Sequence, residues 1–218
     1  MRAKGSLFKD LPVLIVVALV VSLLIKTFLV QFFYIPSGSM ENTLQVKDRV
    51  AVNKVPFVST SIHRGDVVVF RDPDNWLPEI VDYQTNKYVA KVKSALVAVG
   101  VLPNPAKQYL VKRVIGVAGD HVVCCTKNDK LSVNGVEITE PYIFAGNKPS
   151  DMTFDVTVPK GKIWVMGDHR GASADSRYHQ EDINKGFVPV SKVTGRVVAV
   201  IWPFKNITYV PEVDVLKK

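Results

Sequence analysis

The sequence predicts a mostly β fold, in which a β-rich domain follows a single transmembrane helix and is interrupted by one inserted helical segment. An uncharged apolar run fills residues 11–25, and short apolar runs broken by Gly, Pro, Asn and Asp follow from about residue 46. Residues 71–108 differ, because a turn-rich start precedes apolar residues at helical spacing. The expected parts are a tail over 1–10, an anchor over 11–33, the β domain over 34–70 and 109–218, and an insertion over 71–108.

The apolar N-terminal run is the first element. As a helix, residues 11–25 rise only about 22 Å, which is short of the ~30 Å hydrocarbon core of a bilayer. Extending the helix through Phe33 supplies enough length, and Lys26 then reaches toward the headgroups. Bulky residues follow the run, which favours an uncleaved anchor over a secretory signal. Basic residues in the tail favour a cytoplasmic N-terminus, so we expect a single-pass cell-membrane protein with an extracytoplasmic β domain.

The β domain is indicated by apolar runs with turn residues between them. We expect strands within residues 65–70, 109–120, 121–125, 130–138, 162–168 and 195–203. Asn134-Gly135 lies between Val133 and Val136, which is a strong signal for a type I′ hairpin. In the insertion, helical spacing over 86–105 predicts one amphipathic helix, which either contacts anionic lipid through its lysines or packs on the β domain.

The formal net charge of +8 suits an anionic partner, either nucleic acid or a lipid surface. A lipid surface is favoured, because the anchor already brings the chain to a membrane. The sequence also lacks a helix-turn-helix, a zinc-finger spacing and an RNP-like aromatic motif. We therefore expect membrane lipid as a partner, and no nucleic acid.

The two cysteines, Cys124 and Cys125, are adjacent in the sequence. A bond between neighbours closes a strained small ring, and consecutive strand residues point to opposite faces. We therefore expect two packed, unpaired cysteines and no disulfide framework.

The segment PSGSM, residues 36–40, brings small hydroxyls to the point where the apolar run ends. Pro36 restricts the backbone before Ser37, and Gly38 permits an unusual backbone angle. Such a turn can project the Ser39 hydroxyl and leave N–H groups free, as a nucleophile with an oxyanion hole requires. Because a lone serine is more often structural, this interpretation depends on a partner base.

Two kinds of base are available to such a serine. The histidines are His63, His121, His169 and His179. A histidine would complete a Ser-His-Asp arrangement, for which His169 in GDHR is the best placed. The other candidate is Lys112, which strand alternation places on one face with Leu110 and Val114. An apolar setting that lowers its pKa from about 10.4 to about 8 makes roughly one lysine in ten neutral at pH 7. The alternative is an ordinary strand lysine that extends to solvent.

The segment MGDHRGASADSR, residues 166–177, is dense in Gly, Asp, Ser and Arg. Within it Asp175 and Arg177 can pair, and Ser173 can hold a nearby amine. A polar surface turn is the alternative interpretation of such a loop.

Taken together, these segments resemble bacterial type I signal peptidase. The matching blocks, in order after the anchor, are PSGSM with Thr43-Leu44, RGDVVVF, YLVKRVIGVAGD and GDHRGASADSR. The likeness spans about residues 11–203 and is poorest over 71–108. It implies that Ser39 is the nucleophile and Lys112 the general base. The supporting residues that it implies are Ser37 for the oxyanion, Ser173 to orient the lysine, and Asp175 with Arg177 as a salt bridge.

Two residues depart from the family's usual pattern. His169 stands where asparagine is usual, and Asn42 stands where proline is common. Neither belongs to the implied dyad, so the departures affect only the expected geometry of the local loops.

The resemblance implies a membrane-bound serine endopeptidase that removes N-terminal signal peptides from secreted preproteins through an acyl-enzyme, without a cofactor or metal. Its expected partners are these preproteins and membrane lipid. The expected substrate contacts are Pro36, Met40, Leu44 and Met166. One alternative is a self-cleaving repressor, which would need a DNA-binding segment and no membrane span. The other is a non-catalytic, membrane-tethered β domain that binds lipid or a partner.

Overall fold

The computed structural model describes residues 7–54, 62–78, 91 and 108–213, and within the N-terminal helix it describes the side chains of residues 11–21 only. The helix α1 (Leu7–Phe28) precedes the strands. The strands are β1 (Val30–Tyr34), β2 (Arg49–Asn53), β3 (Val67–Arg71), β4 (Tyr109–Gly116), β5 (His121–Cys124), β6 (Leu131–Val133), β7 (Val136–Glu137), β8 (Phe154–Thr157), β9 (Lys162–Met166), β10 (Val188–Pro189), β11 (Val193–Trp202) and β12 (Thr208–Tyr209). The short 3₁₀ helices are η1 (Arg170–Ala172), η2 (Ser176–Tyr178), η3 (Val190–Lys192) and η4 (Phe204–Asn206).

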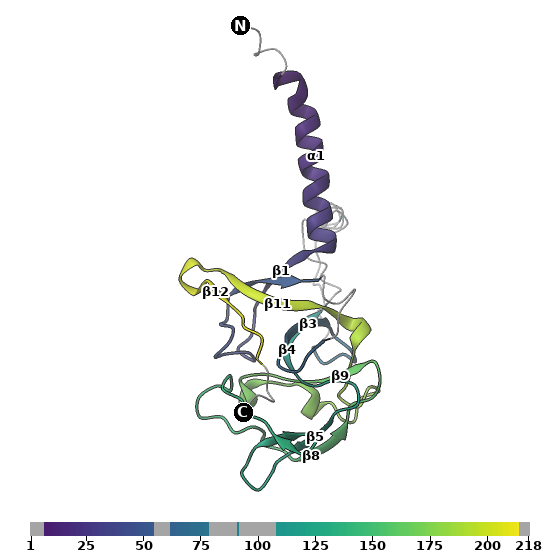
Figure 1. The fold of residues 1–218 in the computed structure, drawn as a ribbon, viewed down its shortest axis with the longest axis vertical. Coiled ribbons are helices and arrows are strands. Elements are labelled where there is room, and N and C mark those ends of the chain that lie inside the picture. The colour runs from purple at the N-terminus through teal and green to yellow at the C-terminus, as the bar shows by residue number, and fades with distance from the viewer. Residues whose placement is uncertain (1–6, 55–61, 79–90, 92–107, 214–218) are drawn as a thin grey trace.

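In the described part of the chain the strands form two antiparallel sheets (Figure 1). The larger sheet has the order β1-β2-β11-β3-β4-β9-β10, with β12 paired to β11, and the smaller sheet has the order β7-β6-β5-β8. The helix α1 extends away from the β body, and the smaller sheet, labelled at β5 and β8, lies at the opposite end. Strand β4 pairs with β3 on one side and with β9 on the other, so its residues lie in the interior of the larger sheet.

Apolar side chains cover both faces of the central strands, which explains why β3 and β4 read as nearly continuous apolar runs. On one face, Val67 and Val69 of β3 join a cluster that also contains Met40 and Leu44. On the other face, Val68 of β3 packs in a cluster with residues of β4 and β9. The chain between β1 and β2 is thereby held against the sheet through its own buried side chains.

Each expected strand run contains a strand, so the mostly β fold is confirmed. The hairpin prediction is confirmed as well. Asn134 and Gly135 have φ angles of 53° and 79°, and a type I′ turn requires positive φ at both central residues. The strands β1, β2, β8, β10 and β12 were not predicted, because they are short or, for β1, lie within the apolar N-terminal run.

The N-terminal helix ends earlier than predicted. α1 ends at Phe28, and residues 30–34 form β1, which pairs antiparallel with β2. The predicted helix through Phe33 was therefore wrong. Valine and aromatic residues also suit a sheet, where Phe33 packs edge-to-face on Tyr109 with ring centroids 5.0 Å apart. Among the residues described here, no helix has both the length and the mean hydropathy of a membrane-crossing segment.

The amphipathic helix predicted over 86–105 lies outside the described residues, except for Lys91, which is helical and exposed. That helix and its lipid contact therefore stay predictions. The proposed domain boundaries also stay predictions.

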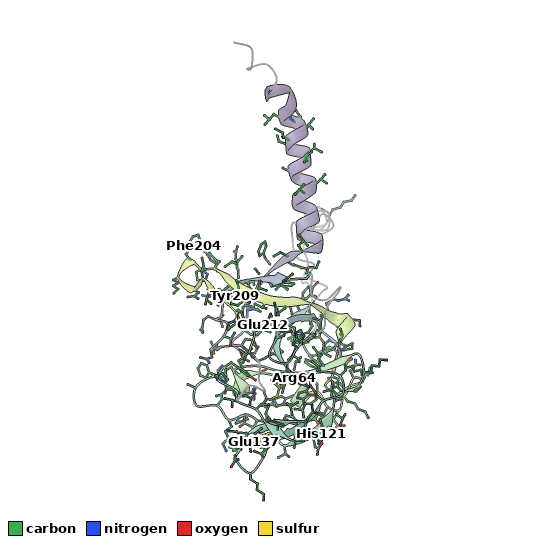
Figure 2. The ribbon with its side chains drawn as sticks, in the orientation of Figure 1. Arg64, His121, Glu137, Phe204, Tyr209 and Glu212 are labelled. Carbon is green, nitrogen blue, oxygen red and sulfur yellow. A yellow bond between two sulfur atoms is a disulfide. The ribbon has the colours of Figure 1, made fainter. Side chains whose placement is uncertain are left out.

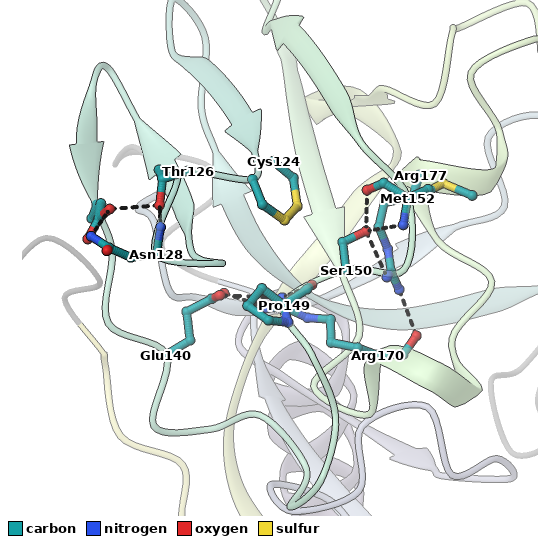
Figure 3. Close-up of a disulfide and its surroundings, with 11 residues drawn as sticks. Cys124, Thr126, Asn128, Glu140, Pro149, Ser150, Met152, Arg170 and Arg177 are labelled. Atoms are coloured by element: carbon teal, nitrogen blue, oxygen red, sulfur yellow. Dashed lines mark hydrogen bonds and ion pairs between the residues drawn. A yellow bond between two sulfur atoms is a disulfide. The ribbon is translucent and has the colours of Figure 1, made fainter.

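The prediction of unpaired cysteines was wrong, because a disulfide joins Cys124 to Cys125 (Figure 3). The argument from strand alternation fails since β5 ends at Cys124, and Cys125 lies beyond the strand. The packing prediction holds: Cys124 is buried in a cluster that joins residues of the smaller sheet to residues of β4 and β9, and Cys125 packs against the same cluster.

Candidate active site

The structure brings Ser39 and Lys112 into direct contact, although they are far apart in the sequence. Lys112 lies in the middle of β4, opposite Val68 of β3, and Ser39 lies in the turn that follows β1. The Lys112 ammonium nitrogen Nζ is 2.7 Å from the Ser39 hydroxyl Oγ. Both residues are buried, with exposed fractions of 4% for Lys112 and 8% for Ser39. The pair therefore has the geometry that a serine nucleophile and its base require.

Burial lowers the pKa of the Lys112 ammonium from its ordinary value of 10.5 to about 8. The negative charges of Asp175 and Asp168 raise this pKa, and the positive charge of Arg177 lowers it. Desolvation is the largest of these effects, since a charged amine loses its hydration in the apolar interior. At a pKa of about 8, roughly one lysine in ten is neutral at pH 7, so the amine can accept a proton.

The turn that carries Ser39 is fixed at both ends by burial and backbone bonds. Met40 and Leu44 are buried immediately after it, and the Glu41 N–H donates to the Gly38 carbonyl at 3.0 Å. Gly38 does not adopt a left-handed φ, although glycine permits one. The Glu41 carboxyl group lies close to Gly38, since an added Cβ would be 2.9 Å from its carboxyl carbon.

Ser37 is exposed at the start of this turn, beside the buried Ser39. Within the described residues, no hydrogen bond involves the Ser37 hydroxyl or the Ser39 backbone N–H. Both groups are therefore available as donors, which an oxyanion hole needs.

The loop after β9 lies against the backbone of the turn that carries Ser39. An added Cβ on Gly167 would lie 2.2 Å from the Ser173 hydroxyl and 2.5 Å from the Ser39 carbonyl oxygen. Only glycine therefore lets this loop approach the nucleophile turn so closely. The Ser173 hydroxyl donates to Asp175 Oδ2 at 2.8 Å. The expected contact of Ser173 with Lys112 is not among the hydrogen bonds of the described residues, so the orienting role stays a prediction.

The expected salt bridge between Asp175 and Arg177 is present and fully buried. Arg177 donates from Nε to Oδ1 at 2.8 Å and from Nη2 to Oδ2 at 2.9 Å. Asp175 also accepts the Gly167 N–H at 2.9 Å. This carboxylate therefore ties the loop after β9 together while its charge raises the pKa of Lys112.

A second buried ion pair near the site was missed by sequence reasoning. Arg113, next to Lys112 on β4, donates to Asp168 from Nε at 2.8 Å and from Nη2 at 2.6 Å. Thr43 donates to the same carboxylate at 2.5 Å, and Arg113 lies over the Tyr142 ring at 4.0 Å. An arginine inside a strand buried on both faces was the available signal, since such a charge needs a partner.

The two departures from the family pattern both contact the segment 142–144. Asn42 has a φ of 88°, which proline cannot adopt, and its side chain donates to the Tyr142 carbonyl at 3.1 Å. The His169 ring stacks on Phe144 with centroids 4.1 Å apart, and its Nδ1 is 2.9 Å from Glu41 Oε2. Asn42 and His169 thus each bind a specific partner in the local loops.

Two of the other histidines have partners outside the dyad. His121 pairs with Asp155 on the smaller sheet, and His179 stacks on Trp76 with centroids 4.3 Å apart. The contact observed at Ser39 is with Lys112, so the histidine alternative is not supported.

Among the expected substrate contacts, only Pro36 is exposed. Met40, Leu44 and Met166 are at most 1% exposed and belong to the hydrophobic core. Substrate contact stays a prediction for all four, and for the three core residues it would require a movement that exposes them.

The sequence model of the family described as "Signal peptidase, peptidase S26" matches residues 8–202. The chain belongs to this family. The peptidase is 38% identical to the protein named "Probable signal peptidase I" from Mycobacterium leprae (strain TN), over 92% of the chain and 78% of that relative. It is 32% identical to "Signal peptidase IB" from Staphylococcus aureus (strain MRSA252), over 89% and 90%. A crystal structure of a signal peptidase I from Enterococcus faecalis V583 matches with a TM-score of 0.39 and 24% identity, over 63% and 97%.

These comparisons confirm the resemblance to bacterial type I signal peptidase. The peptidase is therefore a serine endopeptidase of the signal peptidase I type, and its homologues support a role in removing signal peptides.

Replacing Asp168 with alanine should strongly destabilise the peptidase. Arg113 would remain buried without its bidentate partner, and breaking a buried pair from one side costs about 3–5 kcal/mol. Thermal or urea unfolding measures the change. Asp155→Ala, which removes the partner of His121 at a 71% exposed carboxylate, is the matched control and should leave stability nearly unchanged. Equal stability of both variants would contradict the structural role of Asp168.

Proposed function

We propose that the peptidase cleaves signal peptides from secreted preproteins with Ser39 as nucleophile and Lys112 as general base. The observation that carries this proposal is the 2.7 Å contact between Lys112 Nζ and Ser39 Oγ inside the fold. The lowered pKa of Lys112, about 8, supports its role as a base near neutral pH.

The reaction proceeds through an acyl-enzyme. Neutral Lys112 takes the Ser39 hydroxyl proton while the Ser39 oxygen attacks the scissile carbonyl carbon and forms the tetrahedral intermediate. The Ser39 N–H and the Ser37 hydroxyl donate to the developing oxyanion. The protonated Lys112 then gives its proton to the leaving amine, and the peptide C–N bond breaks. Water, deprotonated by Lys112, attacks the ester, which releases the signal peptide and restores the Ser39 hydroxyl.

The substrates are preproteins whose signal segment binds in an extended conformation, with its main chain paired to a strand edge. Small residues at the first and third positions before the cut fit shallow apolar pockets, as A-x-A sites require. The mechanism uses side chains of the chain itself and needs no cofactor or metal.

Ser39→Ala and Lys112→Met should each lower kcat/KM for preprotein cleavage by at least about a thousandfold, since they remove the nucleophile and the base. Cleavage of a purified preprotein, followed on gels, measures the effect. The matched controls are Ser132→Ala, a buried serine on β6, and Lys162→Met on β9. Both controls should keep cleavage near the wild-type rate. Full activity of Ser39→Ala or Lys112→Met would refute the dyad.

The rate of cleavage should depend on the protonation of Lys112. Because only the neutral amine can accept the Ser39 proton, log kcat/KM should rise by about one per pH unit below the pKa and level off above pH about 8. A profile of kcat/KM from pH 5 to 10 measures this rise, and its midpoint gives the pKa of the base in the free enzyme. A midpoint near 6.5, the usual range of histidine, would contradict lysine as the base.

We also propose that the peptidase is a single-pass cell-membrane protein with a cytoplasmic N-terminus and an extracytoplasmic catalytic domain. The proposal is supported by the uncharged run 11–25 and by the exposed side chains of residues 11–21 in α1. Two exposed aromatic residues of the β body, Phe204 and Tyr209, lie at the end nearest α1 (Figure 2). A net charge of +8 favours an anionic lipid surface as partner.

Protease added to intact cells should therefore digest the β domain and protect the N-terminal tail. Epitope tags placed before Met1 and after Lys218 report the two ends on a blot, and a detergent-lysed sample shows that both tags can be digested. Loss of the N-terminal tag together with survival of the β domain would contradict this orientation.

A further inference from the structure

A link between two loops holds the nucleophile turn without a bond to the Ser39 hydroxyl or to the Lys112 amine. His169, in the loop after β9, binds Glu41, which lies two residues after Ser39. His169 Nδ1 is 2.9 Å from Glu41 Oε2, and since a carboxylate only accepts, the ring nitrogen donates. The two side chains are 20% and 30% exposed, so the bond is partly shielded from water.

The Glu41 carboxylate lies against the backbone of the turn. A Cβ on Gly38 would be 2.9 Å from the carboxyl carbon and from one carboxyl oxygen of Glu41, so this group covers the open face of Gly38. The backbone makes a second connection, because the His169 N–H donates to the Ser39 carbonyl at 3.1 Å. One residue thus holds the turn by its main chain at Ser39 and by its side chain at Glu41.

The face of the His169 ring also has a packing partner. Phe144 stacks on it with an interplanar angle of 18°, and the Phe144 N–H donates to the Asp168 carbonyl at 3.0 Å. Asn42 connects the same turn to the Tyr142 carbonyl. Phe144 thus packs on the ring face while Nδ1, at the ring edge, faces Glu41.

We propose that His169 is a positioning residue for the reaction, acting through Glu41 to hold the Gly38–Ser39 turn where the serine meets Lys112. This inference rests on the proposed function of Ser39. His169 takes no proton from the substrate or from Ser39, because its ring nitrogen Nδ1 is bonded to Glu41 and the serine hydroxyl is bonded to Lys112. Its contribution is geometric, and catalysis by a positioned nucleophile is sensitive to small displacements.

His169→Phe keeps a ring that can stack on Phe144 and removes the bond to Glu41. We expect kcat to fall about tenfold, as for the loss of one partly exposed hydrogen bond to a charged group, with KM within about twofold of wild type. Glu41→Leu should give the same loss, and the double variant should lose no more than either single variant. Glu41→Gln should recover most of the rate, because its amide oxygen still accepts from Nδ1.

The matched control is His121→Phe, which breaks a histidine–carboxylate pair of the same kind on the smaller sheet. Its kcat and KM should equal those of the wild type. Thermal unfolding is measured for every variant, and Glu41→Leu with Glu41→Gln decides the question if His169→Phe does not fold.

Ser39→Ala is assayed beside these variants. If Ser39→Ala is inactive while His169→Phe and Glu41→Leu keep full kcat, the positioning role is refuted and the dyad stands. If Ser39→Ala still cleaves, the proposed function fails and the positioning role fails with it. A loss that appears in KM alone, or equal losses in Glu41→Leu and Glu41→Gln, also refutes the link.

Discussion

The site depends on one constraint, which is that the Lys112 amine is buried and, among the residues that the structure describes, has no hydrogen bond to a carboxylate. Its hydrogen-bonding partner is the Ser39 hydroxyl, and desolvation is the main cause of its lowered pKa. A carboxylate in direct contact would stabilise the charged form and raise the pKa again. The fold must therefore bring acidic groups near enough to organise the loops while keeping them off the amine.

Buried arginines bind the nearby carboxylates, which keeps these carboxylates from binding the Lys112 amine. Asp168 is paired with Arg113 and Asp175 with Arg177, and all four side chains are fully buried. A third pair, Arg170 with Glu140, joins the loop after β9 to the chain beside the smaller sheet, and Arg170 also donates to the Pro149 carbonyl (Figure 3). Because a buried charge without a partner is costly, these pairs fix the loop against the sheet. The loop beside the dyad is therefore held by buried charges that each have a partner.

Much of this arrangement was predictable, and the misses have physical causes. The strands and the turn at Asn134 follow from side-chain alternation and local backbone preference, which act over a few residues. The residues 30–34 were assigned to the helix because their apolar character fits either element, and only pairing with β2 decides between them. The disulfide at Cys124 was missed because β5 ends at that residue, which the alternation argument did not foresee.

The sequence alone determined the family and the order of its motif blocks, because these depend on residue types at fixed spacing, and the resemblance to that family implied the two residues of the candidate dyad. The tertiary structure decided the partners. Two hydrogen bonds, from Thr43 to Asp168 and from His169 to Glu41, join residues that are distant in the chain. The burial of Met166 depends on how the sheets pack. Such contacts arise from long-range packing and from the need to pair each buried charge, and a pattern read along one chain does not specify them.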